Sequence, residues 1–249
     1  MKRYIVCCLA ALSLICSVVY GNSGWEKINM PQDIHSIVID GRLNVLIDGK
    51  SSKSTVQYKA DNVLISHKDG VMTFSSTDQV SGEVTLRLFI AEGLAKMNSL
   101  KLNDESNLTA RGLMGPKNIV INTQGRVLLE GYLNAPLITQ KGHAKTEVMW
   151  LKGDRSRIDV HAGHLQVAGS LQKAAIKVFG DAMCDAKHLR VDNIWLAAGD
   201  QATAIIHPSK ELHAMVGQKA TVTSVYKPKY TSEIVSQRGA LVYQSIFNA

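Results

Sequence analysis

The stretch Ile119-Val-Ile-Asn-Thr-Gln-Gly125 carries a pattern that returns through the second half of the chain. A short apolar strand runs into a glycine, and a polar residue and a second apolar alternation follow that glycine. The glycines of consecutive copies lie 17, 21, 17, 19 and 18 residues apart, a mean of 18.4. A short recurring period of this kind indicates a repeat architecture. The glycines of the five further copies are Gly142, Gly163, Gly180, Gly199 and Gly217.

This period is too short for a strand with a crossover helix, and far below the roughly 40 residues of a propeller blade. It matches one coil of a parallel β-helix, in which strands of successive coils pair about 4.8 Å apart. Glycine recurs because a turn with a positive φ costs least in a residue without a Cβ. We therefore predict an all-β fold: a single right-handed parallel β-helix, or β-solenoid, of about 18-residue coils. The six glycines are expected to lie along one edge of it.

The N-terminal half has the same character. Runs of β-branched residues alternate with a period of two between residues 37 and 90, with turn signals at Asp40-Gly41, Asp48-Gly49 and Asp69-Gly70. Residues 34–249 are therefore expected to form one domain of roughly 12 coils. With 45% apolar and 20% charged residues, the chain is not disordered, collagen-like or a polytopic membrane protein. Aromatic residues make up only 6%, which favours a core of many small layers.

The first 21 residues have the features of a signal peptide. Lys2 and Arg3 give a positive start, residues 4–19 form an uncharged apolar run, and Val19-Tyr20-Gly21 offers small residues for cleavage. We expect the mature chain to begin near Asn22, with residues 22–33 as a linker before the domain. The protein would then be exported to the periplasm, the outer surface or the medium, with no stable membrane span after cleavage.

Two other readings of this segment remain open. Lipid attachment at Cys16 would anchor the protein, although Ile15 occupies a position where that processing needs a small residue. An uncleaved anchor is the second, because the apolar run falls just short of the roughly 18–20 residues that span a bilayer.

The cysteines and the charge agree with export. Three of the four cysteines lie in the first 21 residues, so Cys184 is alone in the mature chain and no internal disulfide can form. The formal charge is +7, but the basic residues are scattered, which argues against a nucleic-acid surface. A basic protein of this kind is compatible with glycans or anionic cell-envelope polymers as partners.

The order of these motifs resembles the GIN domain family of auto-transporter adhesin head domains, from about residue 34 to residue 228. The opening is similar in Ile37-Val-Ile-Asp-Gly41 and in Asn44-Val-Leu-Ile-Asp-Gly49, and the end is similar in Val225-Tyr226-Lys227-Pro228. Between them lie the glycine-centred coils. The resemblance implies a β-solenoid and, through the family's name, adhesion. It carries over no catalytic residue.

Two sets of polar residues are candidate sites. One set follows the repeat glycines and would form a polar ladder along one edge if the coils stack in register: Arg126, His143, His164, Asp181, Asp200 and Gln218. Histidine and aspartate are metal-ligand types, but stacked residues do not converge as a metal requires, so we predict no metal and no cofactor. The second set is a charged surface loop with a possible binding role, formed by Lys152, Asp154, Arg155, Arg157 and Asp159.

Catalytic motifs are missing from the sequence. There is no Gly-x-Ser-x-Gly elbow and no phosphate-binding loop, and Cys184 lies on an alternating strand where a small thiol fills the interior. His161 and His164 stand on either side of a glycine turn, which keeps them from sharing a face. We therefore expect a non-enzymatic, adhesin-like or cell-envelope binding module. Two alternatives stay open: a polysaccharide lyase or hydrolase, and a structural envelope protein that self-associates through its sheet edges.

Overall fold

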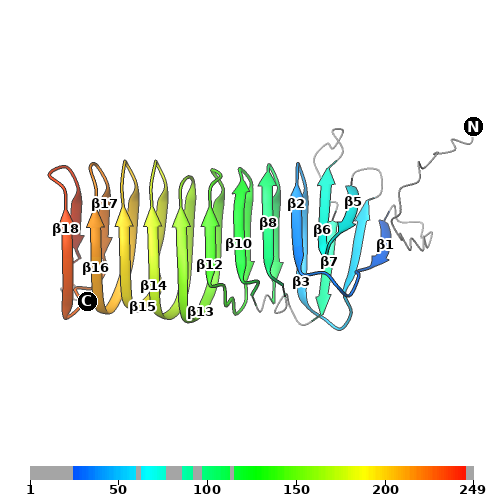
Figure 1. The fold of residues 1–249 in the computed structure, drawn as a ribbon, viewed down its shortest axis with the longest axis horizontal. Helices are drawn as coiled ribbons and strands as arrows, with labels where there is room; N and C mark the ends of the chain where they lie inside the picture. Colours follow the sequence, from blue (N-terminus) through cyan, green and yellow to red (C-terminus); the bar gives the residue numbers. More distant parts are fainter. Residues whose placement is uncertain (1–24, 60–62, 77–85, 92–96, 113–114, 245–249) are drawn as a thin grey trace, which may run out of the picture.

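The computed structural model describes residues 25–59, 63–76, 86–91, 97–112 and 115–244. Within these residues the chain is all-β, has no helix, and forms a β-solenoid of about 8 turns with coils of about 19 residues, which confirms the predicted fold class (Figure 1). Its strands are β1 (Trp25–Asn29), β2 (Ser36–Asp40), β3 (Asn44–Ser51), β4 (Thr55–Lys59), β5 (Val63–Lys68), β6 (Val71–Ser76), β7 (Leu86–Ala91), β8 (Ser99–Asp104), β9 (Asn107–Arg111), β10 (Asn118–Thr123), β11 (Arg126–Glu130), β12 (Leu137–Gln140), β13 (Lys145–Val160), β14 (His164–Val178), β15 (Met183–Ala198), β16 (Thr203–Val216), β17 (Thr221–Ser224), β18 (Tyr230–Val235) and β19 (Ala240–Tyr243).

Each coil contributes one stretch of strand to each of two opposite sheet faces. The first face consists of β8, β10, β12, the C-terminal parts of β13 to β16, and β18, which pair in parallel in that order. The second face consists of β9, β11, the N-terminal parts of β13 to β16, β17 and β19. The chain passes from the first face to the second at the edge that carries the repeat glycines, which we call the glycine edge. It passes back to the first face at the other edge, which we call the return edge.

The six repeat glycines all lie in turns of the glycine edge, as expected. The strand register, however, advances more evenly than the glycines: Arg126 pairs with Lys145, Lys145 with His164 and His164 with Met183, a step of 19 residues each time. The coil length is therefore nearer 19 than 18 residues. Glycine spacing varied because the glycine takes different places within successive turns.

Close packing between coils explains why glycine is needed there. A Cβ built on Gly142 would overlap the backbone carbonyl of Thr123 in the coil before it. Gly163 combines a φ of +73° with a Cβ position only 2.6 Å from the carbonyl oxygen of Ala144. A side chain at either position would push two coils apart.

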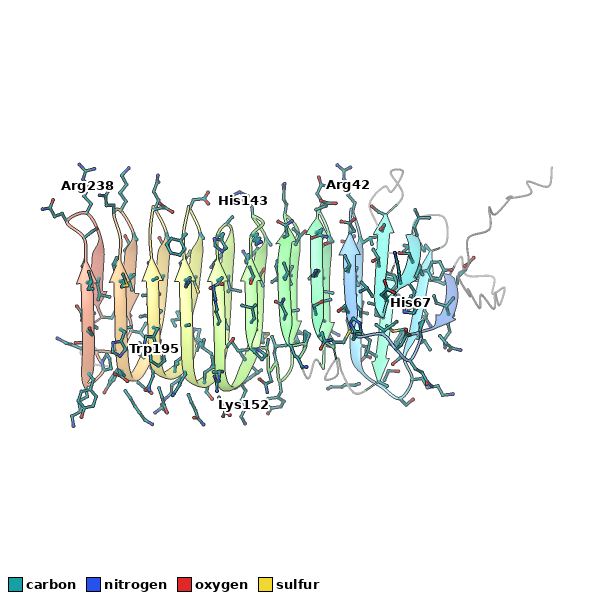
Figure 2. All side chains as sticks on the ribbon, in the orientation of Figure 1. Arg42, His67, His143, Lys152, Trp195 and Arg238 are labelled. Atoms are coloured by element: carbon teal, nitrogen blue, oxygen red, sulfur yellow. The ribbon has the colours of Figure 1, made fainter. Side chains whose placement is uncertain are left out.

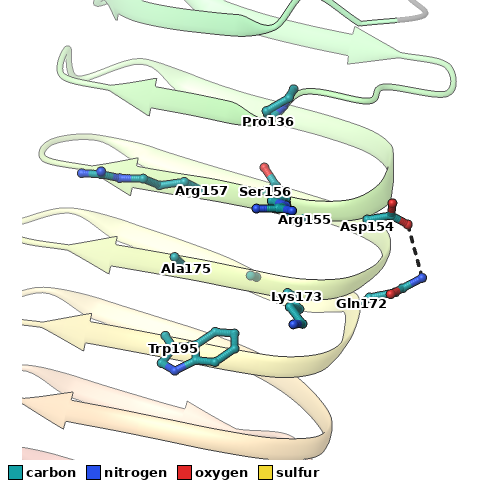
Figure 3. Close-up of a pocket in the computed structure, with 10 residues that line it drawn as sticks. Pro136, Asp154, Arg155, Ser156, Arg157, Gln172, Lys173, Ala175 and Trp195 are labelled. Carbon is teal, nitrogen blue, oxygen red and sulfur yellow. Dashed lines mark hydrogen bonds between the residues drawn. The ribbon is translucent and has the colours of Figure 1, made fainter.

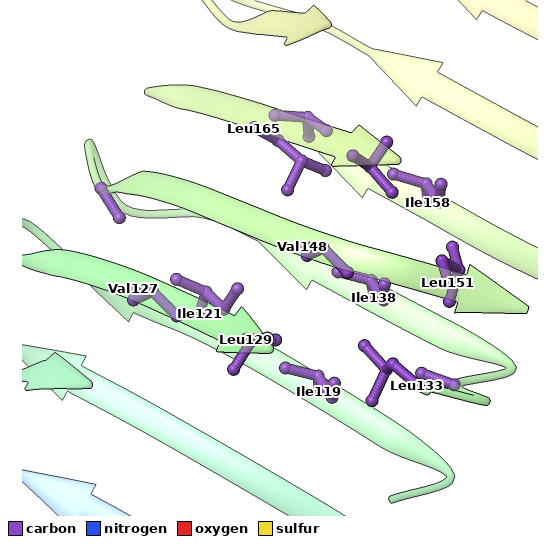
Figure 4. Close-up of a cluster of buried hydrophobic side chains, with 14 of the residues drawn as sticks. Ile119, Ile121, Val127, Leu129, Leu133, Ile138, Val148, Leu151, Ile158 and Leu165 are labelled. Carbon is purple, nitrogen blue, oxygen red and sulfur yellow. The ribbon is translucent and has the colours of Figure 1, made fainter. Parts of the chain in front are cut away.

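The core consists of columns of aliphatic side chains that run along the solenoid, one residue from each coil (Figure 4). Small residues fill the narrow interior near the glycine edge, where Ala182, Ala198 and Ala202 are buried. This explains how the chain folds with few aromatic residues. One such column on the first face contains Met72, Ile37, Leu100, Ile119, Ile138, Ile158, Ile176, Leu196 and Ala214.

The N-terminal end departs from the regular winding. Strands β2 and β3 stack directly on β8 and β9, so Ser36 lies beside Ser99, although 63 residues separate them. Between these two points the chain runs outward, forms the layer of β6 and β7 on the other side of β2 and β3, and returns. Antiparallel strands β1, β4 and β5 cover this end.

Two expectations are corrected here. The stretch 22–33 is not simply a linker, because β1 lies within it and pairs antiparallel with β4 along its full length. The count of 12 coils is too high, because much of the N-terminal part is spent on the end structure and only about 8 regular turns form. The predicted signal peptide at residues 1–21 lies outside the described residues.

The C-terminal coil ends the solenoid differently. By register, Glu233 of β18 continues the buried column that ends with Ala214, and Tyr243 of β19 continues the position of buried Ser224. Tyr243 Oη donates a hydrogen bond to Glu233. Burial, and then this hydrogen bond, raise the pKa of the Tyr243 hydroxyl. The last layer thus places polar groups at two interior positions, beside the aliphatic Val235 and Leu241.

Candidate functional site

An open groove lies on the outer side of the first face. It has a volume of about 470 Å³ and runs over β13, β14 and β15 near the return edge (Figure 3). In the outward column of this face, Arg157 pairs with Ala175, Ala175 with Trp195, and Trp195 with His213. The groove lining comprises Pro136, Asp154, Arg155, Ser156, Arg157, Gln172, Lys173, Ala174, Ala175 and Trp195.

The Trp195 indole is fixed on one side by a neighbouring ring. The His213 imidazole stacks against it with ring centroids 5.7 Å apart and an interplanar angle of 8°. Glu211 Oε1 in turn lies 2.8 Å from His213 Nε2 and holds the imidazole in place. Glu211, His213 and Trp195 therefore form a supported aromatic platform, of which the indole is 43% exposed.

The other side of the indole faces a gap, because the next position in the column is only an alanine. Arg157 and Trp195 stand two strands apart with Ala175 between them, which corresponds to about 9.6 Å at the usual strand spacing. One flat ring in van der Waals contact on both sides needs roughly 7–8 Å. The space over Ala175 is therefore a slot wide enough for a single ring with its substituents.

An apolar hollow lies on the far side of the platform. It has a volume of about 340 Å³ and is bordered by Trp195, His213, Met215 and Ile234. Met215 and Ile234 are 60% and 67% exposed, unusually high for large apolar side chains on neighbouring strands. The two hollows share Trp195 and Ala175, so they form one continuous surface across β13 to β16 and β18.

The charged side chains of the groove divide into neutralised and free ones. Arg157 lies along β13 and bonds to Asp159 through contacts of 2.8–3.0 Å, and this hydrogen bond raises the pKa of the Arg157 guanidinium (Figure 3). Gln172 Nε2 donates to Asp154 Oδ1 over 3.2 Å. Arg155 and Lys173, paired in register, have no carboxylate partner among the described residues.

The predicted charged surface loop is a strand in the structure. All five of its residues lie in β13, where the chain rounds the return edge as continuous strand. Asp154, Arg155 and Arg157 line the groove, and Asp159 is nearly buried beside Arg157. Lys152 is separate from them and lies with its Nζ 5.8 Å from the centroid of the Tyr132 ring.

The predicted polar ladder does not form a single column. Arg126 and His164 occupy the first positions of β11 and β14, two coils apart with Lys145 between them. The remaining four residues, His143, Asp181, Asp200 and Gln218, lie in the turns before the strands. Asp200 caps a neighbouring turn by accepting a hydrogen bond from the Gly180 amide over 3.0 Å. The prediction took the residue directly after each repeat glycine. Because the glycine takes different places within the turns, this position is a strand residue in some coils and a turn residue in others.

The cysteine and the histidine pair considered in the sequence are not brought together in the described part of the chain. Cys184 is fully buried between Leu165 and Ala204, as expected for an interior thiol. His161 stacks on Phe179 at 6.4 Å instead of converging with His164. No group of three or more metal-ligand side chains occurs among the described residues.

Trp195 and His213 were not singled out from the sequence, although a signal was present. Each stands four residues before its repeat glycine, Gly199 or Gly217, directly after the first apolar residue of its copy. Two rings at the same repeat position predict stacking, provided that the copies are in register. The groove also depends on Ala175, and a single small residue in the sequence does not indicate a groove.

Comparison with known proteins places the fold among solved structures. The chain has an 18% identity and a TM-score of 0.74 to a "putative adhesin" from Parabacteroides distasonis, over 88% of this chain and 96% of that one. A "putative adhesin" from Parabacteroides merdae has an identity of 20% and a TM-score of 0.71, over 91% of this chain and 99% of that one. A "putative lipid binding protein" from P. distasonis has an identity of 11% and a TM-score of 0.63, over 90% of this chain and 98% of that one.

No family model matches the chain, and no curated protein matches it in sequence. In the part of the chain that the structure describes, no helix has the length and apolar character to cross a membrane. At these identities the structural likenesses establish a shared fold.

Proposed function

We propose that this protein is an exported, non-enzymatic, adhesin-like module of the GIN domain kind, which binds glycan chains on its first face. The observation that carries the proposal is the slot over Ala175, bounded by the free side of the Trp195 indole. The similar folds named as adhesins support the adhesin-like role. The predicted signal peptide supports export.

A saccharide ring fits this slot chemically. Its C–H face packs against the electron-rich face of an aromatic ring, while its hydroxyls point sideways to polar groups. The groove offers such groups in the exposed side chains of Gln172 and Lys173. A peptide strand is a poorer fit, because strand addition needs unpaired backbone groups, and the strands under the groove are paired on both sides.

An open slot of this size gives weak binding at a single site. We expect a dissociation constant on the order of 1 mM for one short oligosaccharide. Adhesion is compatible with this, because many copies on one surface multiply the strength of attachment.

Two substitutions test the proposal on immobilised glycans. Trp195→Ala removes the platform and Ala175→Leu fills the slot, and both should lower retention at least about tenfold on those glycans that the parent protein retains. Trp150→Ala is the matched control, because Trp150 is also an exposed tryptophan of β13, 62% accessible, but is not among the residues that line the groove.

The same experiment separates the competing functions. Soluble sugar fragments released with turnover would identify a lyase or hydrolase and contradict the non-enzymatic assignment. Retention that is equal in the parent and both groove variants would contradict binding at this face. If the parent retains no glycan but assembles into oligomers, the structural envelope role replaces the proposal.

A further inference from the structure

Arg155 and Lys173 are the free cations of the groove. They face the same side of neighbouring strands, both exposed, with no carboxylate partner among the described residues. Arg157 is neutralised by Asp159, and Asp154 is the one carboxylate among the residues that line the groove. A pair of adjacent like charges repels itself, so it is relieved when an anion binds between the two.

The position of the pair relative to the slot is also fixed by register. Arg155 and Lys173 precede Arg157 and Ala175 by two residues on β13 and β14. Two residues of strand correspond to about 6.6 Å. A ring that stacks on Trp195 over Ala175 therefore has its edge directed at the two cations, at the distance of a substituent on that ring.

We propose that the groove recognises an acidic polysaccharide, with one sugar ring in the slot and its anionic substituent bound by Arg155 and Lys173. This inference rests on the proposed glycan-binding function and adds the class of glycan. The arginine can bind a carboxylate or a sulfate through two parallel hydrogen bonds, whereas the lysine acts as a point charge. Both anions share this chemistry, and the carboxylate and the sulfate are distinguished by the probes.

The test compares probes that differ only in charge. Oligogalacturonate carries a carboxylate on each ring, and its methyl ester has the same rings without the charge. Dextran sulfate and dextran form the corresponding pair for sulfate. By calorimetric titration we expect an anionic probe to bind about tenfold more tightly than its neutral partner, since two exposed charge contacts together supply roughly this factor. This difference in affinity between the anionic and the neutral probe should shrink as the salt concentration is raised from 0.05 to 0.5 M.

Variants connect the charge preference to the two residues. The double variant Arg155→Gln with Lys173→Gln should lose the preference and its salt dependence, but keep binding to the neutral probe. The variant Arg155→Lys with Lys173→Arg keeps both charges and should retain most of the preference. The matched control Lys141→Gln with Arg238→Gln removes one lysine and one arginine that are exposed in turns of the glycine edge, where Figure 2 labels Arg238, and should leave the preference unchanged.

The outcomes separate the two proposals. Equal binding of acidic and neutral probes, abolished by Trp195→Ala, would overturn the acidic class and leave glycan binding in place. A preference lost equally in the control pair would also overturn it, since a diffuse basic surface would then be responsible. If no probe binds and Trp195→Ala changes nothing, glycan binding itself fails. Circular dichroism of every variant excludes unfolding as the cause.

Discussion

Trp195 owes its exposed position to the side chains beside it. An isolated tryptophan on a sheet face can rotate onto its neighbours and cover its own apolar surface. Here the His213 ring blocks that movement on one side, and Ala175 offers nothing to cover on the other. The indole therefore keeps one face available without any change on binding, which lowers the entropic cost of taking up a ligand.

Cys184 is the opposite case, a polar group enclosed by the coil interior. Burial raises the pKa of its thiol from 9.0 to about 12, with the neighbouring Asp185 carboxylate as a second cause. The thiol is therefore neutral in the folded protein at any ordinary pH. A neutral, enclosed thiol neither attacks substrates nor exchanges with disulfides.

This shift predicts a loss of stability at high pH. The folded pKa lies above the unfolded one, so alkali ionises the thiol of the unfolded chain first and stabilises that state. The contribution is complete below about pH 9 and is lost progressively between pH 9 and 12. From pH 8 to pH 10 the thiol alone should cost about 1.4 kcal/mol of unfolding free energy.

Chemical denaturation of the parent and of Cys184→Ala at the two pH values measures this cost. The alanine variant starts from a lower stability, because it loses buried volume. Its further loss between pH 8 and pH 10 should be smaller than the parent's by the same amount, about 1.4 kcal/mol. Parallel losses in the two proteins would show that Cys184 is not enclosed as described.

The turns of the glycine edge depend on how closely successive coils approach. At Gly142 an added methyl group meets the rigid backbone of Thr123, whereas at Gly199 it meets only the Phe179 ring, at 2.9 Å. We expect Gly142→Ala to lower the unfolding free energy by roughly 2–3 kcal/mol, and Gly199→Ala by less, because a side chain can move aside more easily than a backbone. Thermal or urea denaturation of both variants would settle the order, and an equal loss would contradict it.

The repeat could be recognised in the sequence because each coil must solve the same packing problem. Gly125, Gly142 and Gly163 mark places where a Cβ would overlap the backbone of the coil before, so they reveal the glycine edge directly. The Asp69-Gly70 signal is similarly local and does form the tight turn between β5 and β6, with φ values of +49° and +69°. Such signals depend on neighbours in sequence or on one contact in the next coil.

Features that depend on non-local pairing could not be predicted in the same way. Asp48-Gly49 has the composition of a turn but lies within β3, where the register with β7 shifts between Asp48 and Ser51, so the strand continues through an irregularity instead of turning. The stacking of β2 on β8 joins residues 63 apart, and no short-range pattern encodes it. The groove joins β13, β14 and β15, so the exact register had to be known before Arg155, Lys173 and Trp195 could be placed together.

The two ends of the rod are protected by different means. A solenoid exposes unpaired strand edges at both ends, and these can stack on another copy unless they are covered. At the N-terminal end the strands β1, β4 and β5 provide cover. At the C-terminal end β18 and β19 are the last layer of the described residues, and Glu233 stands at the end of an aliphatic column.

A charge in that position acts against end-to-end association. A second rod that docked on β18 would bury Glu233 and Tyr243 between two cores, and burying a carboxylate costs several kcal/mol unless it is fully compensated. Removing the charge should therefore remove the barrier. We expect Glu233→Val to form dimers at micromolar concentration, detectable by sedimentation or light scattering, under conditions in which the parent does not associate through this end.

Glu233→Gln makes the role of the charge testable apart from that of the side-chain shape. The amide can still accept the Tyr243 hydrogen bond but carries no charge, and its burial costs less than that of a carboxylate. We expect this variant to associate more weakly than Glu233→Val and more strongly than the parent. Association in the order valine, glutamine, glutamate would establish electrostatic protection of the end. Equal association of all three proteins would contradict protection of this end by the Glu233 charge.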